Sequence, residues 1–175
     1  MTVDERDVAA VEQQLGRPPR GIHAIGHRCS CGLPDVVTTE PRLEDGTPFP
    51  TTYYLTCPRA ASLIGTLEAS GLMREMTDRL ATDPDLAVAH RRAHEAYLAA
   101  RRRIGEVAEI DGVSAGGMPD RVKCLHVLAA HALAAGPGVN PLGDEVLDRL
   151  GAWWQAGPCV AVADGAEPAA AEEPA

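Results

Sequence analysis

The chain has 175 residues, a length that suits one domain with most of its apolar surface buried around a single core. Apolar residues make up 45% of it but aromatic residues only 3%, so we expect a core of Leu, Val, Ile and Ala, typical of closely packed helices. The formal charge of −9 argues against nucleic-acid binding, which needs a basic face.

The sequence also predicts where the protein resides. No apolar stretch approaches the roughly 18 to 20 residues of a membrane span, and the start lacks the basic-then-apolar pattern of a signal peptide. We therefore expect a cytoplasmic protein that makes no membrane contact. The five cysteines would be kept reduced there, so their spacing indicates metal ligands or reactive thiols rather than disulfides.

In the first third of the chain, the residue spacing predicts one helix followed by a small sheet. Residues 4–15 carry apolar side chains three and four apart, which form the stripe of an amphipathic helix. Segments 22–28, 34–40 and 50–56 are rich in β-branched or aromatic residues and are separated by turn-forming Gly and Pro. They predict three short antiparallel strands.

The rest of the chain is predicted to be helical, because the period of the apolar residues changes from two to between three and four. Asp83-Pro84-Asp85 separates two helical stretches, and Pro119 is a favourable first residue for the next. The expected helices span 58–82 with a break near Gly71, 85–105, 119–135 and 143–155.

These elements predict an α+β fold, in which a small three-stranded antiparallel sheet packs against a bundle of about four to five helices. We expect one compact domain over residues 1–156. Residues 157–175 consist largely of Ala, Glu, Pro and Gly, with too little apolar mass to fold, so they are predicted to form a disordered tail. Cys159 lies in that tail and is excluded from the predicted site.

The other four cysteines are predicted to gather into one metal site. Cys29 and Cys31 follow the first predicted strand and Cys57 the third, so they meet if these strands are neighbours in the sheet. Cys124 lies in the opening turns of the helix expected from residue 119. Four thiolates suit a structural zinc ion, and an iron–sulfur cluster is the alternative. The competing interpretation is that they are ordinary, partly buried thiols.

Histidines near these cysteines are candidate ligands or proton-exchanging groups. His27 lies two residues before Cys29 on the same side of a strand, which makes it a substitute ligand. On a helix, Cys124 and His126 would be about 200° apart, so they are not expected to share an ion. A hydrogen-bonded histidine in the core or at its edge is the commoner outcome for His126 and His131.

A glycine-rich segment before the expected helix start is a candidate anion site. Gly116 and Gly117 precede Pro119, while Arg121 and Lys123 follow in the predicted opening turns. Free backbone N–H groups and the helix dipole attract phosphate or carboxylate at such a terminus. The segment does not match a Walker A loop.

Four blocks of sequence stand out in order along the chain, namely Arg28–Gly32, Thr47–Pro58, Gly116–His126 and Ala130–Asp144. Together they resemble the bacterial domain-of-unknown-function family 501, over about residues 5–155. The resemblance implies no established activity, cofactor or catalytic residue. Members of the family are often encoded beside a septum-formation initiator and an exopolyphosphatase-like protein, which implies a context in cell division or phosphate metabolism.

Two functions follow from these observations. The first, which we prefer, is a binding or regulatory module in which a cysteine-bound metal fixes the sheet to a helix and a protein partner contacts the surface. The second is an enzyme acting on a small phosphorylated or anionic compound. Arg121 and Lys123 would bind the anion, and His126 or His131 would exchange protons, since the unperturbed pKa of histidine is about 6.5. Familiar hydrolase and dehydrogenase motifs are missing from the sequence.

Overall fold

The structure, a computed structural model, describes residues 2–162. Within them, a three-stranded antiparallel sheet and six α-helices form the predicted α+β fold. None of these helices is both long enough and apolar enough to cross a membrane. The strands are β1 (Ile22–Arg28), β2 (Pro34–Thr39) and β3 (Tyr53–Leu55), and the helices are α1 (Glu5–Leu15), α2 (Pro58–Ala69), α3 (Leu72–Thr82), α4 (Pro84–Ile104), α5 (Leu125–Ala135) and α6 (Pro141–Leu150).

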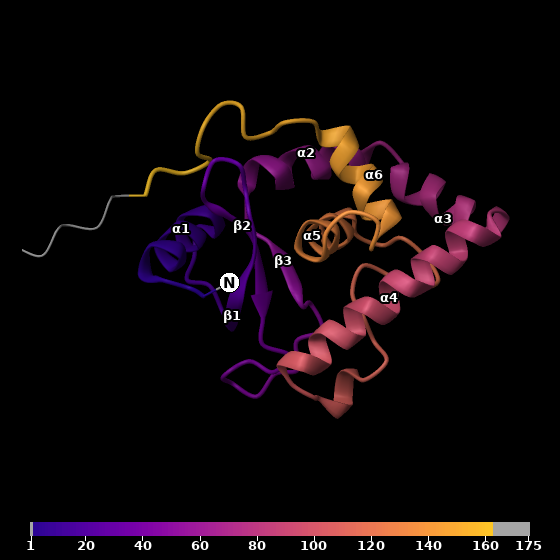
Figure 1. Ribbon diagram of the computed structural model, residues 1–175, viewed down its shortest axis with the longest axis horizontal. Coiled ribbons are helices and arrows are strands. Elements are labelled where there is room, and N and C mark those ends of the chain that lie inside the picture. Colours follow the sequence, from indigo (N-terminus) through magenta and orange to yellow (C-terminus); the bar gives the residue numbers. More distant parts are fainter. Residues whose placement is uncertain (1, 163–175) are drawn as a thin grey trace, which may run out of the picture.

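The sheet has the strand order β1-β2-β3, and helices lie on both of its faces (Figure 1). Successive side chains of a strand point to opposite faces, so the adjacent Val36 and Val37 of β2 enter different clusters. Val36 belongs to the main core with the later helices, whereas Val37 packs with Val11 of α1 and Ile25 of β1. Both valines are buried, which places the central strand between two apolar layers.

Helix α5 lies at the centre of the helical layer, where Figure 1 shows it almost end-on. It contacts all three strands, α2 and α6. Leu125 and Leu128 are fully buried in it. The closest approach is made by Gly143 of α6, where an added Cβ atom would stand 2.2 Å from the backbone oxygen of Leu128. Only glycine therefore allows α6 to pack this closely on α5.

The start of α5 differs from the prediction, because the helix begins at Leu125 and not at Pro119. Two of the preceding N–H groups, those of Val122 and Lys123, bond to partners that are incompatible with a helix. Val122 donates to the Thr77 hydroxyl of α3 at 3.0 Å. Lys123 donates to the carbonyl of Gly116 at 2.7 Å, which closes a loop. Tertiary contacts thus override the local preference of proline for a first helical position.

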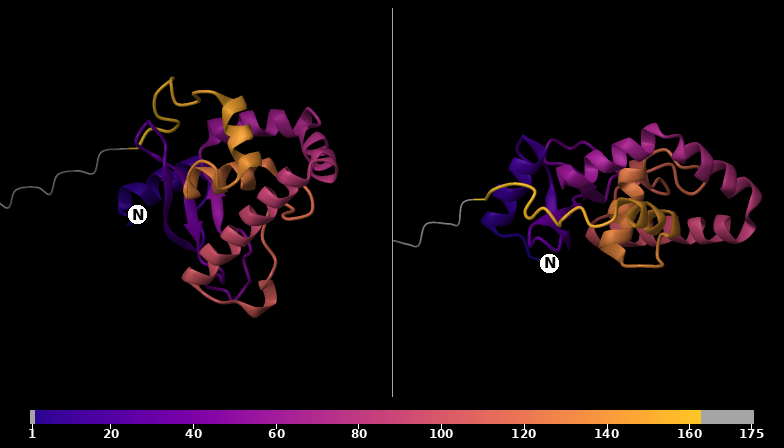
Figure 2. Two further views of the ribbon diagram at one scale, coloured as in Figure 1. Left: turned by 45° about the vertical axis from the view of Figure 1, so that its right-hand side comes forward. Right: turned by 90° about the horizontal axis from the view of Figure 1, so that it is seen from above.

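The last helix spans Pro141–Leu150 instead of 143–155. Its earlier start follows from Asn140, whose side chain accepts the Gly143 N–H at 3.1 Å and caps the helix. The chain then returns toward the sheet (Figure 2). The predicted domain boundary at residue 156 falls within this described segment. Residues 163–175, the remainder of the predicted tail, lie outside the described residues.

Specific contacts hold the returning segment. Arg59 of α2 donates to the carbonyl oxygens of Gly157 and Pro158, at 2.6 Å and 3.1 Å. Gln14 of α1 donates to the Cys159 sulfur at 3.2 Å, and to the carbonyl of Pro34 at 2.7 Å. The C-terminal segment, as we call residues 157–162, is therefore attached to α1 and to α2.

Gly143→Ala is expected to destabilise the fold by about 1–3 kcal/mol, because the new methyl group overlaps the backbone of α5. Gly65→Ala is the matched control, since Gly65 is also helical and an added Cβ has no neighbour within 4 Å there. Alanine at that position should stabilise α2 by up to about 1 kcal/mol. Urea unfolding measures both changes. Equal stability of the two variants would contradict the close packing of α5 and α6.

Candidate metal centre

Three potential metal ligands meet where the end of α2 passes the start of α5. They are the carboxylate of Glu68, the thiol of Cys124 and the imidazole of His126, whose ligand atoms all lie within 4.8 Å of one another. No other group of three His, Cys, Asp or Glu side chains within residues 2–162 meets this condition. All three are partly buried, so an ion would be accessible from solvent yet surrounded by protein on one side.

The backbone at the start of α5 explains why Cys124 and His126 come together. Cys124 is the residue before the first helical turn, and its backbone is extended, with φ −152° and ψ 115°. The angular separation expected for two helical residues does not apply to it. Its sulfur lies 3.9 Å from Nδ1 of His126. The expected separation of about 200° between these two side chains is therefore wrong.

Glu68 completes the group because the start of a buried helix needs hydrogen-bond acceptors. Its Oε1 accepts the Leu125 N–H at 2.7 Å and lies 3.1 Å from His126 Nδ1. Glu68 was not among the predicted site residues. One signal in the sequence could have indicated it. An acidic side chain in the last turn of α2 is unfavourable next to the negative end of the helix dipole, which suggests that Glu68 is there for a contact outside its own helix.

The ring of His126 is held in one orientation. Its Nε2 lies 3.1 Å from the carbonyl oxygen of Ala61, which only accepts hydrogen bonds, so Nε2 carries a proton. Nδ1 is thereby directed to Cys124 and Glu68. The hydrogen bond with Cys124, and after it the Glu68 carboxylate, raise the pKa of His126 to about 9 although burial lowers it. A metal ion would have to displace the Nδ1 proton.

A cavity adjoins this group. Cys124 and His126 line a space of about 600 Å³ beside β3 and the first turns of α2. The hydroxyl-bearing residues Tyr53, Thr56 and Ser62 also line it. Its size and its mixture of apolar and polar walls are those of a small-molecule site.

The structure does not bring the four predicted cysteine ligands into one group. Cys29 and Cys31 lie in the turn between β1 and β2, and Cys57 lies just before α2, at the same end of the sheet. The strands that lead to these cysteines are not neighbours, as the prediction required, because β2 lies between β1 and β3. Cys124 lies instead with Glu68 and His126, although it lines a cavity together with Thr56 and Pro58, the neighbours of Cys57.

Cys29 and Cys31 form the first of two thiol pairs. Their turn is closed by Gly32, which donates to the Cys29 carbonyl at 2.8 Å and adopts φ +87°, a conformation that favours glycine. Burial raises the pKa of the Cys29 thiol to about 12. The N–H of Cys31 acts in the opposite direction, and the Cys31 thiol adds to the rise.

Cys57 and Cys159 form the second pair. Burial raises the pKa of the Cys57 thiol to about 11, the N–H groups of Ala60 and Arg59 oppose the rise, and the Cys159 thiol adds to it. Cys159 was excluded from the predicted site because of the composition around it. Composition does not reveal the bonds from Arg59 and Gln14 that place Cys159 beside Cys57.

A family model with the description "Protein of unknown function (DUF501)" matches residues 25–148. The chain belongs to the DUF501 family. The match confirms the resemblance inferred from the four sequence blocks. It includes Glu68, Cys124 and His126 but not Cys159. No curated protein and no solved structure matches the chain.

In this DUF501 chain, the predicted anion-binding residues lie in the loop before α5. Arg121 and Lys123 are exposed. Gly116 and Gly117 have φ values of +73° and +91°, and a Cβ at Gly117 would stand 2.9 Å from the Arg121 backbone oxygen. The glycines are therefore needed to close the loop. Glu68 already occupies the first N–H of α5, and anion binding by Arg121 and Lys123 stays a prediction.

His27 and Asp35 form a pair across neighbouring strands. His27 Nδ1 lies 2.7 Å from Oδ1 of Asp35, whose side chain is fully buried. This hydrogen bond raises the pKa of His27, while burial lowers it. His27, the predicted substitute ligand, is thus engaged with a carboxylate.

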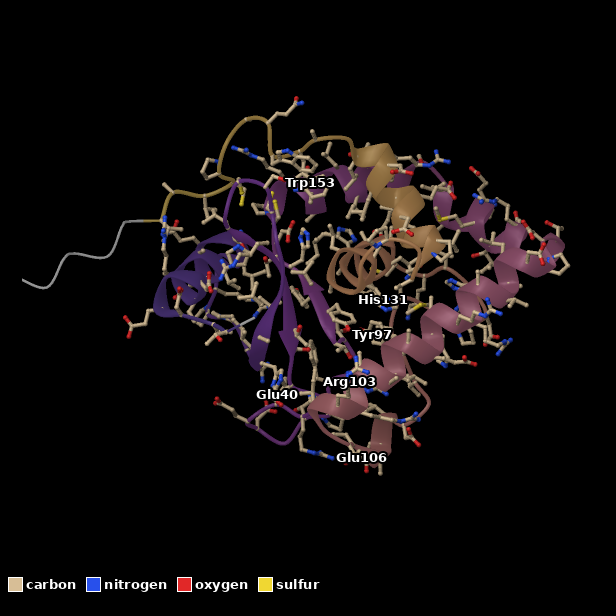
Figure 3. All side chains as sticks on the ribbon, viewed as in Figure 1. Glu40, Tyr97, Arg103, Glu106, His131 and Trp153 are labelled. Atoms are coloured by element: carbon tan, nitrogen blue, oxygen red, sulfur yellow. The ribbon has the colours of Figure 1, made fainter. Side chains whose placement is uncertain are left out.

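His131 is a buried core residue, as expected for a hydrogen-bonded histidine within the core. It stacks on Tyr53, with ring centroids 5.4 Å apart. It meets Tyr97 of α4 edge-on, with ring centroids 5.2 Å apart, and Figure 3 shows these two residues side by side. Asn140 Nδ2 lies 3.2 Å from its Nδ1, and because Asn140 Oδ1 accepts the Gly143 N–H, Nδ2 is the donor. Nδ1 is therefore unprotonated. Burial lowers the pKa of His131 to about 4.

His131 is expected to make the fold less stable as the pH falls. Its pKa is about 4 in the folded chain and about 6.5 in the unfolded chain. Between these values the unfolded state binds the extra proton, so lowering the pH favours unfolding by up to about 3 kcal/mol. Urea unfolding over this range should show a steeper loss for the wild type than for His131→Phe, which cannot ionise. Parallel curves would contradict the assignment.

Proposed function

We propose that this protein binds a zinc ion through Glu68, Cys124 and His126 and uses the ion to hold a small anionic ligand in the adjoining cavity. One observation carries the proposal. Oxygen, sulfur and nitrogen donors converge while the far nitrogen of His126 is held by the Ala61 carbonyl. Oxygen, sulfur and nitrogen are the donor atoms that zinc takes in proteins. Metal-bound histidines generally donate their second N–H to a carboxylate or a backbone carbonyl.

The same geometry argues against a proton relay between thiol, imidazole and carboxylate. In such a relay the nucleophile and the orienting carboxylate use opposite nitrogens of the ring. Here Cys124 and Glu68 both face Nδ1. A shared cation accounts for this arrangement better than a catalytic thiol does.

The number of ligands indicates what the ion would do. Structural zinc sites have four protein ligands, whereas sites with three keep one position for water or substrate. Cys124 and His126 line the cavity, so that position would be accessible to a ligand there. We thus retain the metal-binding module that we preferred from the sequence. Its metal ligands become a carboxylate, a thiol and an imidazole in place of four cysteines.

An enzyme acting on a small anionic compound is the second candidate. The open position favours it, because zinc lowers the pKa of bound water to about 7 and so supplies a nucleophile. The exposed Arg121 and Lys123 lie in the loop that ends at Cys124 and offer positive charge for the anion. The binding module and the enzyme share the site and differ in whether the ligand is turned over.

Removal of a ligand is expected to abolish zinc binding at this site. Full-length protein, Cys124→Ser and His126→Ala would be stripped of metal, titrated with Zn²⁺ and analysed for bound zinc. Each variant should bind about one ion fewer per chain than the wild type. His23→Ala is the matched control, because His23 also pairs with a carboxylate, Glu40 at 2.7 Å, but has no thiol beside it. Equal zinc content in all four proteins would contradict the proposal.

Binding of an anion at the open position is tested with Co²⁺ in place of zinc, because the visible spectrum of bound cobalt changes when its ligands change. Inorganic phosphate is expected to change the spectrum of the wild type and to leave that of Cys124→Ser unchanged. Hydrolysis of a chromogenic phosphate ester by the zinc-loaded wild type, lost in Cys124→Ser, would favour the enzyme. A spectrum that does not respond to phosphate would contradict an open position accessible to anions.

A further inference from the structure

Strand β3 forms one edge of the sheet, since within the described residues it pairs with β2 alone. Between antiparallel strands, the backbone groups of alternate residues point toward the partner strand. Thr56 donates its N–H to a carbonyl of β2 at 2.8 Å, and the carbonyl of Thr52 accepts an N–H of β2 at 2.9 Å. The backbone groups of Tyr53 and Leu55 therefore point away from β2, toward the open edge.

These outward backbone groups lack partners. Within residues 2–162, neither the N–H nor the carbonyl of Leu55 makes a hydrogen bond, and the carbonyl of Tyr53 makes none. Leu55 is buried, so water reaches its backbone poorly. Polar backbone groups in such surroundings are costly to leave unpaired. A free strand edge of this kind is a template for a further strand.

A cavity opens along this edge. It is the space of about 600 Å³ that Cys124 and His126 also line, and its wall includes all three residues of β3. Helix α1 borders it on one face of the sheet, and α2 and the start of α5 border it on the other. Figure 1 accordingly shows β3 between α1 and α5. The edge is thus recessed between helices.

The recessed position decides what can pair with the edge. Paired strands lie about 4.8 Å apart. A second copy of the chain would carry its own β3 between the same helices, so two folded copies cannot bring these strands together. A single extended peptide is narrow enough to enter the cavity, whose volume is that of a ligand site. The side chains of Leu15, Tyr54 and Val127 offer it apolar contacts, and Thr51 and Ser62 offer hydroxyl groups.

The candidate metal centre lies toward one end of this cavity. Nε2 of His126 is 3.1 Å from the carbonyl oxygen of Ala61, in the helix that follows β3. Cys124 and His126 are therefore found beyond the last residue of β3, toward which a peptide paired with the strand would extend. The terminal carboxylate of such a peptide supplies an oxygen ligand of the kind that an open zinc position accepts.

We propose that an extended peptide of a partner protein pairs with β3 as a fourth strand and directs its C-terminal carboxylate to the candidate metal centre. Main-chain hydrogen bonds to Tyr53 and Leu55 hold it, which is how other proteins add a peptide strand to a sheet edge. The strand pairing depends on β3 alone. The place of the carboxylate rests on the proposed zinc site, whose anionic ligand it names.

Peptides methylated at the backbone test the strand pairing. Zinc-loaded full-length protein would be titrated against a fluorescein-labelled hexapeptide of alternating threonine and valine with a free carboxylate, and binding followed by fluorescence anisotropy. Two further peptides carry N-methyl groups on either the valines or the threonines. Because only alternate residues of a strand face its partner, one methylated peptide should lose binding and the other should keep it. Equal binding of the two, or no binding of the parent peptide, would overturn the proposal.

Ser62→Trp is expected to close the cavity to the peptide. Ser62 is exposed on α2 and lines the cavity, so a bulky ring there occupies the place of the peptide without entering the core. Thr66→Trp is the matched control, because Thr66 is also exposed, one turn later in α2, and is not part of the cavity wall. The affinity should fall at least about tenfold in the first variant and stay unchanged in the second. Circular dichroism verifies both folds, and a loss in both variants or in neither contradicts the binding place.

An amidated peptide separates this inference from the proposed zinc site. The free acid should bind the wild type about tenfold more tightly than the amide, and should bind Cys124→Ser no better than the amide does. Acid and amide that bind the wild type alike would overturn the place of the carboxylate. If the zinc site alone is wrong, Cys124→Ser retains the zinc content of the wild type while the two methylated peptides still differ. A dimer in sedimentation that Ser62→Trp abolishes would assign the edge to a second copy and overturn the proposal.

Discussion

Helix α5 is apolar around its whole circumference, and such a helix is stable only where other elements surround it. The sheet, α2 and α6 do so, and α6 comes close enough to need glycine at residue 143. A helix start enclosed in this way has N–H groups that water reaches poorly, so they need protein acceptors. Glu68 meets that need for Leu125. The ligand group at the start of α5 therefore follows from the burial of the helix.

Most of the fold could be predicted because its signals are local. The β-branched segments and the period of the later helices each depend on neighbours in the sequence, and Gly71 separates α2 from α3 as expected. The start of α5 depends instead on a bond between Val122 and Thr77, far apart in the chain. No pattern within residues 115–126 encodes that contact, whereas Pro119 itself favours a helix.

The sites were predicted less well, because they also depend on contacts between residues far apart in the chain. Antiparallel pairing placed Cys29, Cys31 and Cys57 at one end of the sheet, but the pattern did not reveal that β2 separates the strands that carry them. The positions of Cys124 and Cys159 depend on single side chains. A late helix start turns Cys124 toward Glu68, and Arg59 holds the carbonyls that precede Cys159. Composition averages over a segment and does not detect two hydrogen bonds within it.

The position of Cys159 beside Cys57 bears on the order in which the protein matures. A chain leaves the ribosome from its N-terminus, and its elements can assemble as they emerge. Cys29, Cys31 and Cys57 are thus synthesised about a hundred residues or more before Cys159. Throughout that interval Arg59 and Gln14 lack their C-terminal partners. The end of the sheet is therefore the last part of the described fold to close, and a nascent chain halted before residue 157 would still present it open.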